Sequence, residues 1–221
     1  MKYFELDTQS QFEEKNLCLA IGNFDGFHKG HIAILNLLKK IANKKNQPPA
    51  IMSFNPHPRE FFENKNKNFN IYSKSDKINF LENFDINIYI DFCFDKNLSE
   101  LSANQFVESI LIKKLNIRDL IVGKDFKFGK NRSGDFKILK NYYKKNNFEI
   151  HIVDSIMQSD NSDKYSSSII RENIKNGKIE NVNFALGRCW HMSSKVIEGD
   201  KRARKINFPT ANMIPGKHIQ P

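Results

Sequence analysis

The sequence predicts an α/β fold built on a parallel β-sheet, and three observations lead to this fold class. First, an apolar run at 17–21 is followed by a glycine-rich turn and then by a helical pattern of apolar residues from residue 32. Second, two prolines introduce another apolar run at 48–54, which completes a strand–helix–strand unit typical of a parallel crossover. Third, short apolar runs and helical patterns alternate as far as residue 186.

The remaining elements follow from the same periodicities. Residues 1–15 are mixed in character, so we expect a lead-in element ahead of the first strand. We expect further strands at 86–90 (extending toward 94), 120–122 and 148–153, and a polar loop at 64–70. Helices are expected at 74–84, behind Ser102 within the segment 98–115, and at 135–145, 165–174 and 179–186. Ser102 is a candidate N-cap in the 98–115 segment, because a serine oxygen can accept a free N–H of the first helical turn.

Composition limits the class of protein. The chain has 221 residues, of which 39% are hydrophobic, enough for a buried core. No segment is long and apolar enough to span a membrane, and the first residues do not resemble a secretory leader. Cys18, Cys93 and Cys189 are widely spaced and odd in number, which predicts neither a disulfide framework nor a structural zinc site. These features favour a cytoplasmic protein in a reducing compartment.

The formal net charge of +10 is less informative than its size suggests. Excess positive charge attracts polyanions, including nucleotides and nucleic acids. However, lysine and asparagine are abundant throughout the chain, including stretches with the character of ordinary surface such as 43–46 and 64–67. The charge therefore predicts no specific nucleic-acid partner.

The turn after the first apolar run carries the chemistry. Residues 22–31 read GNFDGFHKGH, and they lie between a strand and a helix. Backbone N–H groups and the positive end of a helix converge on a phosphate in this geometry, and glycines allow the backbone to approach closely. His28 and His31 lie where the helix begins, so both can face one anion. Such donors suit nucleotidyl transfer, in which negative charge builds up on phosphate oxygens.

Two more loops follow predicted strands. Pro56, His57, Pro58 and Arg59 form a rigid turn after the second strand, and Asp125, Phe126, Phe128 and Arg132 follow the strand at 120–122. Carboxyl ends of parallel strands meet at one edge of a sheet, where ligands collect. Aromatic and polar side chains together can hold a planar heterocycle. The alternative is that both segments simply pack against their own domain.

A serine-rich run at 165–174 opens a later helix. Ser167 and Ser168 can satisfy its free N–H groups, and Arg171 lies about one turn further on. An ordinary N-cap with a surface arginine would explain the same residues. Hydroxyls at a helix N-terminus together with a guanidinium can also clamp a triphosphate.

These motifs, taken together, resemble one family. The His-x-Gly-His signature at 28–31 resembles that of adenylyl- and cytidylyltransferases. The longer string, with the F-x-P-H-P and G-x-D-F-x-F-G segments, is similar to the FAD synthetase module of bacterial bifunctional riboflavin kinase/FAD synthetases. The run around Arg171 resembles the S-S-T-x-I-R motif of the superfamily, with Ser168 in place of threonine.

The resemblance implies a Rossmann-like nucleotidyltransferase domain over 1–186 and a set of site residues. The implied catalytic residues are His28, His31 and Arg171; the ATP-binding residues Gly22, Asn23, Phe24, Asp25, Gly30, Ser167 and Ser168; the substrate-pocket residues Pro56, His57, Pro58, Arg59, Asp125, Phe126, Phe128 and Arg132. The implied reaction transfers AMP from ATP to FMN, giving FAD and pyrophosphate, with Mg²⁺ screening the phosphate charges.

The last residues resemble the opening of a riboflavin kinase β-barrel, so 187–221 is expected to be the N-terminal fragment of that domain. Its P-T-A-N motif places Thr210 and Asn212 at Mg²⁺ and nucleotide phosphates. Ala203 and Asn207 stand where the family generally has glycine. About thirty residues cannot bury a core alone, so we expect kinase activity on riboflavin only in a full-length form.

Two other functions remain open. The same chemistry could act on a different phosphorylated acceptor, although the 56–58 and 125–126 segments weigh against it. A basic module that binds flavin or RNA without turnover would show strongly salt-dependent RNA binding and no release of pyrophosphate.

Overall fold

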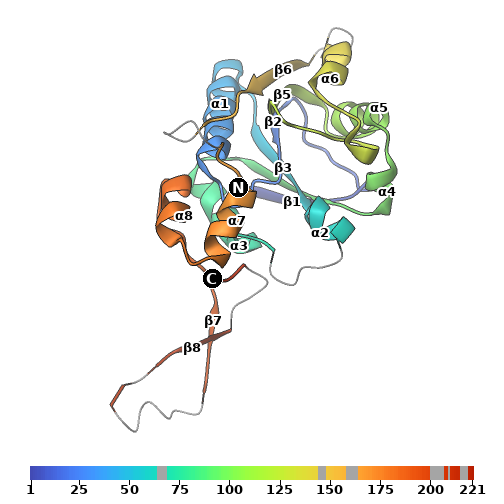
Figure 1. Cartoon of the computed structure of the whole chain (residues 1–221). Coiled ribbons are helices and arrows are strands. Elements are labelled where there is room, and N and C mark those ends of the chain that lie inside the picture. The colour runs from blue at the N-terminus through green and yellow to red at the C-terminus, as the bar shows by residue number, and fades with distance from the viewer. Residues whose placement is uncertain (64–68, 144–147, 158–163, 200–206, 209, 215–218) are drawn as a thin grey trace.

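The computed structural model describes residues 1–63, 69–143, 148–157, 164–199, 207–208, 210–214 and 219–221. Its centre is a six-stranded sheet in the order β1-β4-β3-β2-β5-β6, and every pair is parallel (Figure 1). The strands are β1 Lys2–Leu6, β2 Leu17–Ile21, β3 Pro49–Asn55, β4 Ile88–Cys93, β5 Ile117–Gly123 and β6 Glu149–Val153. The predicted parallel α/β fold is confirmed.

Helices connect these strands. They are α1 Lys29–Lys45, α2 Pro58–Glu63, α3 Lys74–Asn83, α4 Lys96–Glu100, α5 Ala103–Gln105, the π-helical η1 Phe106–Lys114, the 3-10 turn η2 Lys130–Arg132, α6 Phe136–Tyr143, α7 Ser167–Lys175 and α8 Ile179–Leu186. The end of the helix expected over 135–145 and most of the loop expected at 64–70 lie outside the described residues.

The helix expected behind Ser102 in the 98–115 segment is confirmed, and a separate short helix, α4, precedes it. Leu101 is extended, and it separates α4 from the next helical segment. Ser102 caps that segment as predicted: its side chain accepts from the backbone N–H of Gln105, whose side chain in turn accepts from the N–H of Ser102. Reciprocal capping of this kind starts a new helix, which explains the break.

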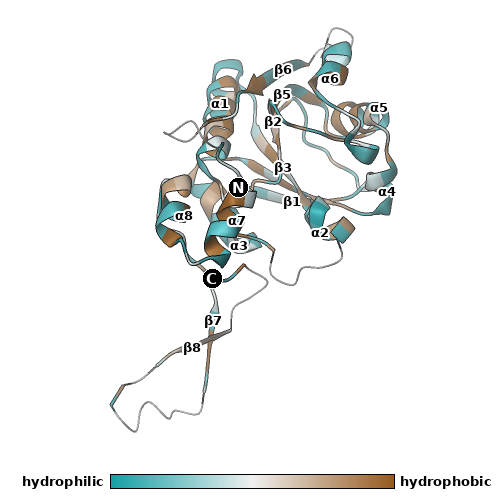
Figure 2. Cartoon of the chain, in the orientation of Figure 1, coloured by the Kyte–Doolittle hydropathy of each residue, from teal (hydrophilic) through white to brown (hydrophobic). Residues whose placement is uncertain are grey.

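Helices cover both faces of the sheet. All five residues of β2 are buried, because this strand lies inside the sheet with neighbours on both sides. Alternate β2 side chains, Cys18 and Ala20, pack with α1, whereas Leu17, Leu19 and Ile21 pack with α4, α5 and η1. Figure 2 shows helices that combine hydrophilic and hydrophobic residues, as expected when one side of each helix is buried.

The strand order places a switch point beside β2. From β2 the chain passes through α1 to β3 and then to β4, and it later returns to β5 on the other side of β2. Crossovers that leave a central strand in opposite directions open a crevice at the carboxyl ends of the strands, where α/β proteins bind ligands. The GNFDGFHKGH turn follows β2 at this point.

The N-terminal element is a full strand. β1 pairs with β4 along its whole length and forms an edge of the sheet, which the mixed composition of residues 1–15 did not reveal. An edge strand is exposed on one side, so its sequence needs only a weak apolar pattern.

The C-terminal residues form a hairpin. β7 Lys195–Ile197 pairs with β8 Asn212–Ile214 in an antiparallel, two-stranded sheet that projects from the body of the molecule (Figure 1). The described residues after α8 contain no further strand, so the expected barrel stays a prediction. Ala203 lies outside the described residues, and Asn207 has a left-handed backbone with φ of 59°.

Candidate active site

A cavity of about 1030 Å³ opens at the carboxyl ends of β2, β3, β5 and β6. It brings together residues from every predicted motif of the first 186 residues. The predicted residues that line it are Gly22, Asn23, Phe24, His28, Gly30, His31, His57, Pro58, Arg59, Asp125, Phe126, Phe128, Arg132, Ser167, Ser168 and Arg171. Asp25 and Pro56 do not line it, and neither do Thr210 and Asn212, which are exposed near β8.

The turn after β2 has an unusual backbone. Phe24 and Phe27 adopt left-handed conformations, with φ of 43° and 45°, which large side chains rarely do. Both rings are fully buried, and Phe27 stacks on Phe80 with a centroid distance of 4.3 Å. Packing of these rings thus holds a strained turn, and strain of this kind is concentrated at functional sites.

Gly30 lies close to the ring of His28. A Cβ at this position would lie 3.1 Å from ring atoms of His28. The glycine in His-x-Gly-His therefore leaves room for the first imidazole against the helix backbone.

His28 and His31 form a stacked pair at the N-terminus of α1, with ring centroids 3.7 Å apart. His28 is the N-cap, and its Nδ1 accepts from the backbone N–H of His31 at 3.3 Å. Because Nδ1 is the acceptor, the neutral imidazole of His28 carries its proton on Nε2 and can donate it. Nδ1 of His31 is buried and has no hydrogen-bond partner among the described residues.

Burial keeps both imidazoles neutral near pH 7. It lowers the pKa of His28 to about 4, and the cations Arg171 and Arg188 act in the same direction while Asp25 opposes them. The pKa of His31 also lies well below its usual value, through burial and then the proximity of His28. The pair therefore acts as neutral N–H donors and not as permanent cations.

Asp25 lies behind the cavity, where it does not contact the space that ATP was expected to occupy. Its carboxylate is fully buried and accepts from Arg171 Nη2 at 2.7 Å and from the backbone N–H groups of Ile71 and Tyr72. Burial raises the pKa of Asp25, but the nearby Lys77 and Arg171 outweigh it and hold the pKa below its ordinary value. Asp25 is thus a structural anchor for Arg171, which does line the cavity.

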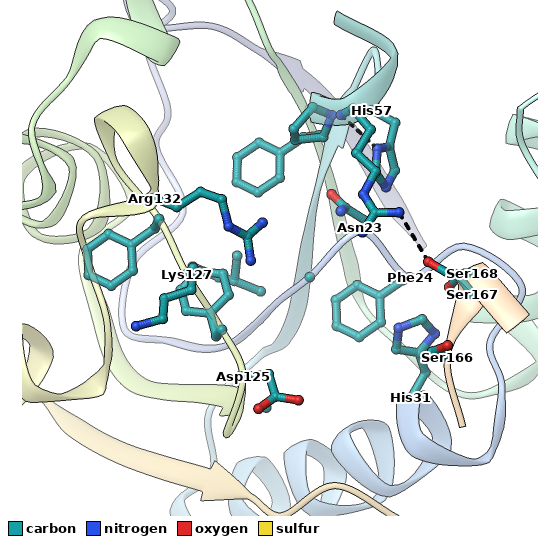
Figure 3. Close-up of a pocket in the computed structure, with 18 of the residues that line it drawn as sticks. Asn23, Phe24, His31, His57, Asp125, Lys127, Arg132, Ser166, Ser167 and Ser168 are labelled. Atoms are coloured by element: carbon teal, nitrogen blue, oxygen red, sulfur yellow. Dashed lines mark hydrogen bonds between the residues drawn. The ribbon is translucent and has the colours of Figure 1, made fainter. Parts of the chain in front are cut away.

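The serine run begins α7 as predicted. Ser166 is the N-cap and accepts from the N–H of Ile169, while Ser167 Oγ donates to the carbonyl of Asp25 at 2.7 Å. Ser168 Oγ accepts from Arg59 Nη1 at 3.1 Å, a bond that joins α7 to α2. Figure 3 shows these serines beside His31, on one side of the cavity. Ser166 lines the cavity too, although the sequence analysis did not select it.

His57 lies in the turn after β3. Its Nδ1 accepts from the backbone N–H of Arg59 at 3.1 Å, and its ring packs against Phe69. Burial and then the charge of Arg171 lower the pKa of His57 to about 3. A third neutral imidazole therefore borders the cavity.

The opposite side of the cavity is formed by the loop after β5, which carries Asp125, Lys127 and Arg132 (Figure 3). Phe128 is 6% exposed, stacks on Phe126 and packs at a tilt against Phe106, so it also belongs to the core. Asp125 pairs with Lys164, and both line the cavity.

Several aromatic residues of the cavity are not among the site residues predicted from the sequence. Phe54, Phe62, Phe94 and Phe106 line it together with Phe126 and Phe128. Phe94 packs edge-on against Phe54 and Phe62. Phe94 directly follows β4. Its place at the cavity could be inferred only once the strand order, with β4 two strands from β2, was known.

A separate group of possible metal ligands lies near the start of β5 and β6, away from the cavity. Asp119, Glu149 and His151 have ligand atoms within 4.8 Å of one another. However, Lys45 pairs with Asp119 at 2.6 Å and with Glu149 at 3.0 Å. The ammonium already occupies the position of a cation, so we interpret the group as an ion-pair network.

Two expectations from the composition concern membrane-spanning segments and cysteines. No helix in the described part of the chain is long and apolar enough to cross a membrane. Cys18, Cys93 and Cys189 are all free thiols.

The chain is similar to a group of bifunctional enzymes. It is 39% identical over 204 residues to a bifunctional riboflavin kinase/FMN adenylyltransferase of Buchnera aphidicola, covering 92% of this chain and 65% of that protein. Proteins of the same description from Haemophilus influenzae (35% identity, 92% and 65% coverage) and Escherichia coli K12 (31%, 96% and 67%) also match. The chain thus spans about two thirds of the length of these relatives.

A solved structure shares the fold. A crystal structure described as a macrolide-efflux protein from Streptococcus pneumoniae superposes with a TM-score of 0.86 and 25% identity, covering 99% of this chain and 71% of that one. The riboflavin kinase family model matches residues 186–221. The FAD synthetase family model matches residues 10–169, which include every cavity-lining motif residue selected from the sequence except Arg171, and the chain therefore belongs to the FAD synthetase family.

Proposed function

We propose that this chain transfers AMP from ATP to FMN, producing FAD and pyrophosphate. One observation carries the proposal: the N-termini of α1 and α7 meet at one cavity, with two stacked neutral imidazoles on the first and three serines on the second. Helix N-termini bind phosphate through their free N–H groups and the helix dipole. Two such termini, facing one space, suit a triphosphate and not a single phosphate.

The chemistry needs no strong base. The phosphate of FMN is already anionic at neutral pH and can attack the α-phosphorus of ATP, forming one P–O bond as the bond to pyrophosphate breaks. Charge then builds up on the α-phosphate oxygens and on pyrophosphate. N–H donors of His28 and His31 would stabilise that charge, and Ser167, Ser168 and Arg171 would hold the β- and γ-phosphates.

The cavity also suits a second, aromatic substrate. Its volume of about 1030 Å³ is at the upper end for a small-molecule site, which supports binding of two substrates together. Phe62, Phe94 and Phe126 line the part of the cavity formed by α2, β4 and the loop after β5. We assign this part to the isoalloxazine ring of FMN, because flat fused rings stack on aromatic side chains.

We expect Mg²⁺ to bind as a complex with ATP. The cavity offers few free carboxylates, since Asp125 pairs with Lys164 and Asp154 with Lys124. Mg²⁺ commonly keeps several waters and binds through substrate phosphates, so this donor set fits a nucleotide-borne ion. Bound there, Mg²⁺ would neutralise phosphate charge.

The C-terminal segment belongs to a second activity. We propose that Thr210 and Asn212 serve riboflavin kinase, with Mg²⁺ and riboflavin, in a protein with the complete barrel. The match of 186–221 to that family model supports this assignment.

Free thiols at all three cysteines support a cytoplasmic location.

An assay of FAD formation tests the main proposal. Purified chain with ATP, Mg²⁺ and FMN should release pyrophosphate and FAD in equal amounts, whereas riboflavin in place of FMN should give neither. Pyrophosphate release with another phosphorylated acceptor but not with FMN would identify a different transferase. Flavin or RNA binding without pyrophosphate release would contradict the proposal.

A further inference from the structure

We propose that the segment after α8, which matches the kinase family model, is a structural part of the adenylyl-transfer site. In this proposal Arg188 is a positioning residue for His28, and Ile219 is one for Arg171. The inference rests on the proposed function. Neither residue lines the cavity, so each must act through the residues that it holds.

Arg188 binds the back of the turn after β2. Its Nη2 donates to the carbonyl of Gly26 at 2.8 Å, and its Nη1 donates to the carbonyls of Phe27 and Leu186, both at 3.0 Å. The guanidinium also lies over the ring of Phe80, 4.5 Å from its centroid. A planar fork of donors is required to reach two neighbouring carbonyls and a ring at once, and lysine does not have it.

The carbonyls that Arg188 binds belong to residues directly before His28. Gly26 and Phe27 have φ of 90° and 45°, so their carbonyls are outside any regular hydrogen-bond ladder. Without the guanidinium, two carbonyls of a strained turn would lose their donor, and the turn could relax. His28 would move with it. A misplacement of about 1 Å in a catalytic group can reduce the rate about 100-fold.

Ile219 acts on the other half of the site. It is 1% exposed, packs in one cluster with Ile71 and Ile170, and donates its backbone N–H to the carbonyl of Asn70 at 2.9 Å. Trp190 packs against the same cluster, and its Nε1 lies 3.4 Å from the carbonyl of Ile71.

The segment 69–72 transmits these contacts to the site. On its inner side the carbonyl of Phe69 accepts from Arg171 Nε at 3.0 Å, and the N–H of Ile71 donates to Asp25. On its outer side it contacts Trp190 and Ile219. Arg171 is therefore held by a segment whose other side is fixed by the C-terminal residues.

Arg188→Gln tests the first half. We expect kcat for FAD formation to fall about 10- to 100-fold, with less than about threefold change in the KM for FMN, because the turn and not the flavin side is disturbed. Arg188→Lys should be similarly impaired. Arg118→Gln is the matched control, since Arg118 bonds Asn16 near the start of β5, and it should retain wild-type kcat.

A double-mutant cycle separates positioning from stability. If Arg188 acts through His28, Arg188→Gln should reduce kcat less than about twofold when His28→Asn is already present. Equal reductions in both backgrounds, or no reduction in the single variant, would refute the assignment. Assays are run well below the unfolding temperature of each variant, which is measured in parallel.

Ile219→Pro tests the second half, because proline removes the N–H that bonds Asn70. We expect a several-fold higher KM for ATP than in Ile219→Val, which keeps both the N–H and the burial. The increase should vanish in an Arg171→Lys background. A KM for ATP that is unchanged in Ile219→Pro, or raised equally in both backgrounds, would overturn the role of Ile219.

A spectroscopic readout distinguishes this inference from the proposed function. If wild-type chain makes no FAD, the reaction assignment fails, but the positioning claim can still be measured. Imidazole ¹⁵N NMR of His28 should show the Nε2–H form in wild type and altered ¹⁵N shifts in Arg188→Gln. Identical His28 spectra in the two proteins would refute positioning, whatever the reaction is.

Discussion

His28 performs two tasks with one ring. Its Nδ1 caps α1, and His28 lines the cavity, so the residue that starts the helix also offers its Nε2–H to the proposed phosphate site. The cap works only while Nδ1 is unprotonated. Burial, which lowers the pKa of His28 to about 4, thus preserves the cap at neutral pH, whereas Nε2 carries its proton in either form.

The first prediction concerns pH and stability. The pKa of His28 falls from 6.5 to about 4 on folding, so the unfolded chain binds a proton in this range that the folded chain does not. Stability should therefore decrease as the pH is lowered from about 6.5 to about 4. His28→Asn keeps a capping acceptor but cannot titrate, so its stability should depend less steeply on pH. Urea unfolding at several pH values measures this, and parallel curves for the two proteins would contradict it.

The hydroxyl of Ser168 gives a second prediction at this scale. Ser168→Ala removes the acceptor for Arg59 and a proposed phosphate ligand, and one hydrogen bond contributes roughly 0.5–1.5 kcal/mol. We expect kcat/KM for ATP to fall about 3- to 10-fold. Ser168→Thr retains the hydroxyl and should remain within about twofold of wild type. Equal losses in the two variants would show that the size of the side chain matters and not its oxygen.

At the scale of elements, the loop after β5 owes its shape to two glycines. Gly129 has φ of 72°, and a Cβ there would lie 2.7 Å from backbone atoms of Ala103. A Cβ on Gly134 would lie 2.6 Å from the ring of Phe128. The loop therefore folds back on itself with Phe128 held between the cavity and the core.

Gly134→Ala tests this arrangement. The added methyl group should displace Phe128, lowering the unfolding temperature and raising the KM for FMN severalfold, since Phe128 lines the proposed flavin side. Gly123→Ala is the stability control, because the nearest atom to its Cβ would be 3.8 Å away, and its unfolding temperature should stay near that of wild type. Equal unfolding temperatures in both variants would mean that the loop adapts freely.

Sequence patterns predicted helices and strands well where one strong local feature, such as an apolar run or a helix cap, defined them. The apolar run at 17–21 is β2 to the residue, and Ser102 caps a helix as expected. The failures have physical causes. β1 is an edge strand with a weak pattern, and α4, which was not predicted, is a short helix that extended Leu101 separates from the cap at Ser102.

Site residues were predictable where the local sequence pattern placed a motif between a strand and a helix. His28 and His31 follow a strand and precede a helix, and both line the cavity. Asp25 was assigned to ATP because it lies inside the same motif, yet its partner Arg171 is distant in sequence, so nothing local showed that it faces inward. Arg188 lies outside every recognised motif, and only the folded chain reveals the carbonyls that it binds.

At the scale of the whole molecule, the Asp25–Arg171 pair ties the first half of the sheet to α7. Asp25 is 0% and Arg171 8% exposed, with Lys77 3.8 Å from the carboxylate. Removing one partner of a buried pair leaves an uncompensated charge, which typically costs about 3–5 kcal/mol. The pair thus matters for folding as well as for the proposed catalysis.

Arg171→Met should therefore reduce the free energy of unfolding by about 3 kcal/mol, at the lower end because Lys77 still faces Asp25. Adding Asp25→Asn should recover part of that loss by removing the isolated charge, although neither variant should be active. Urea titrations followed by circular dichroism provide the values. A double variant less stable than Arg171→Met alone would contradict this account.

The long distance in sequence between Asp25 and Arg171 also has a consequence while the chain is being synthesised. Asp25 and Arg171 are 146 positions apart, so β2 and its turn leave the ribosome long before α7 is made. Until then the carboxylate of Asp25 has no guanidinium, and the turn that presents His28 lacks the guanidinium of Arg188 as well. A nascent chain can assemble much of the sheet early, but the turn that carries His28 gains the guanidinium contacts of Arg171 and Arg188 only after translation has passed α8.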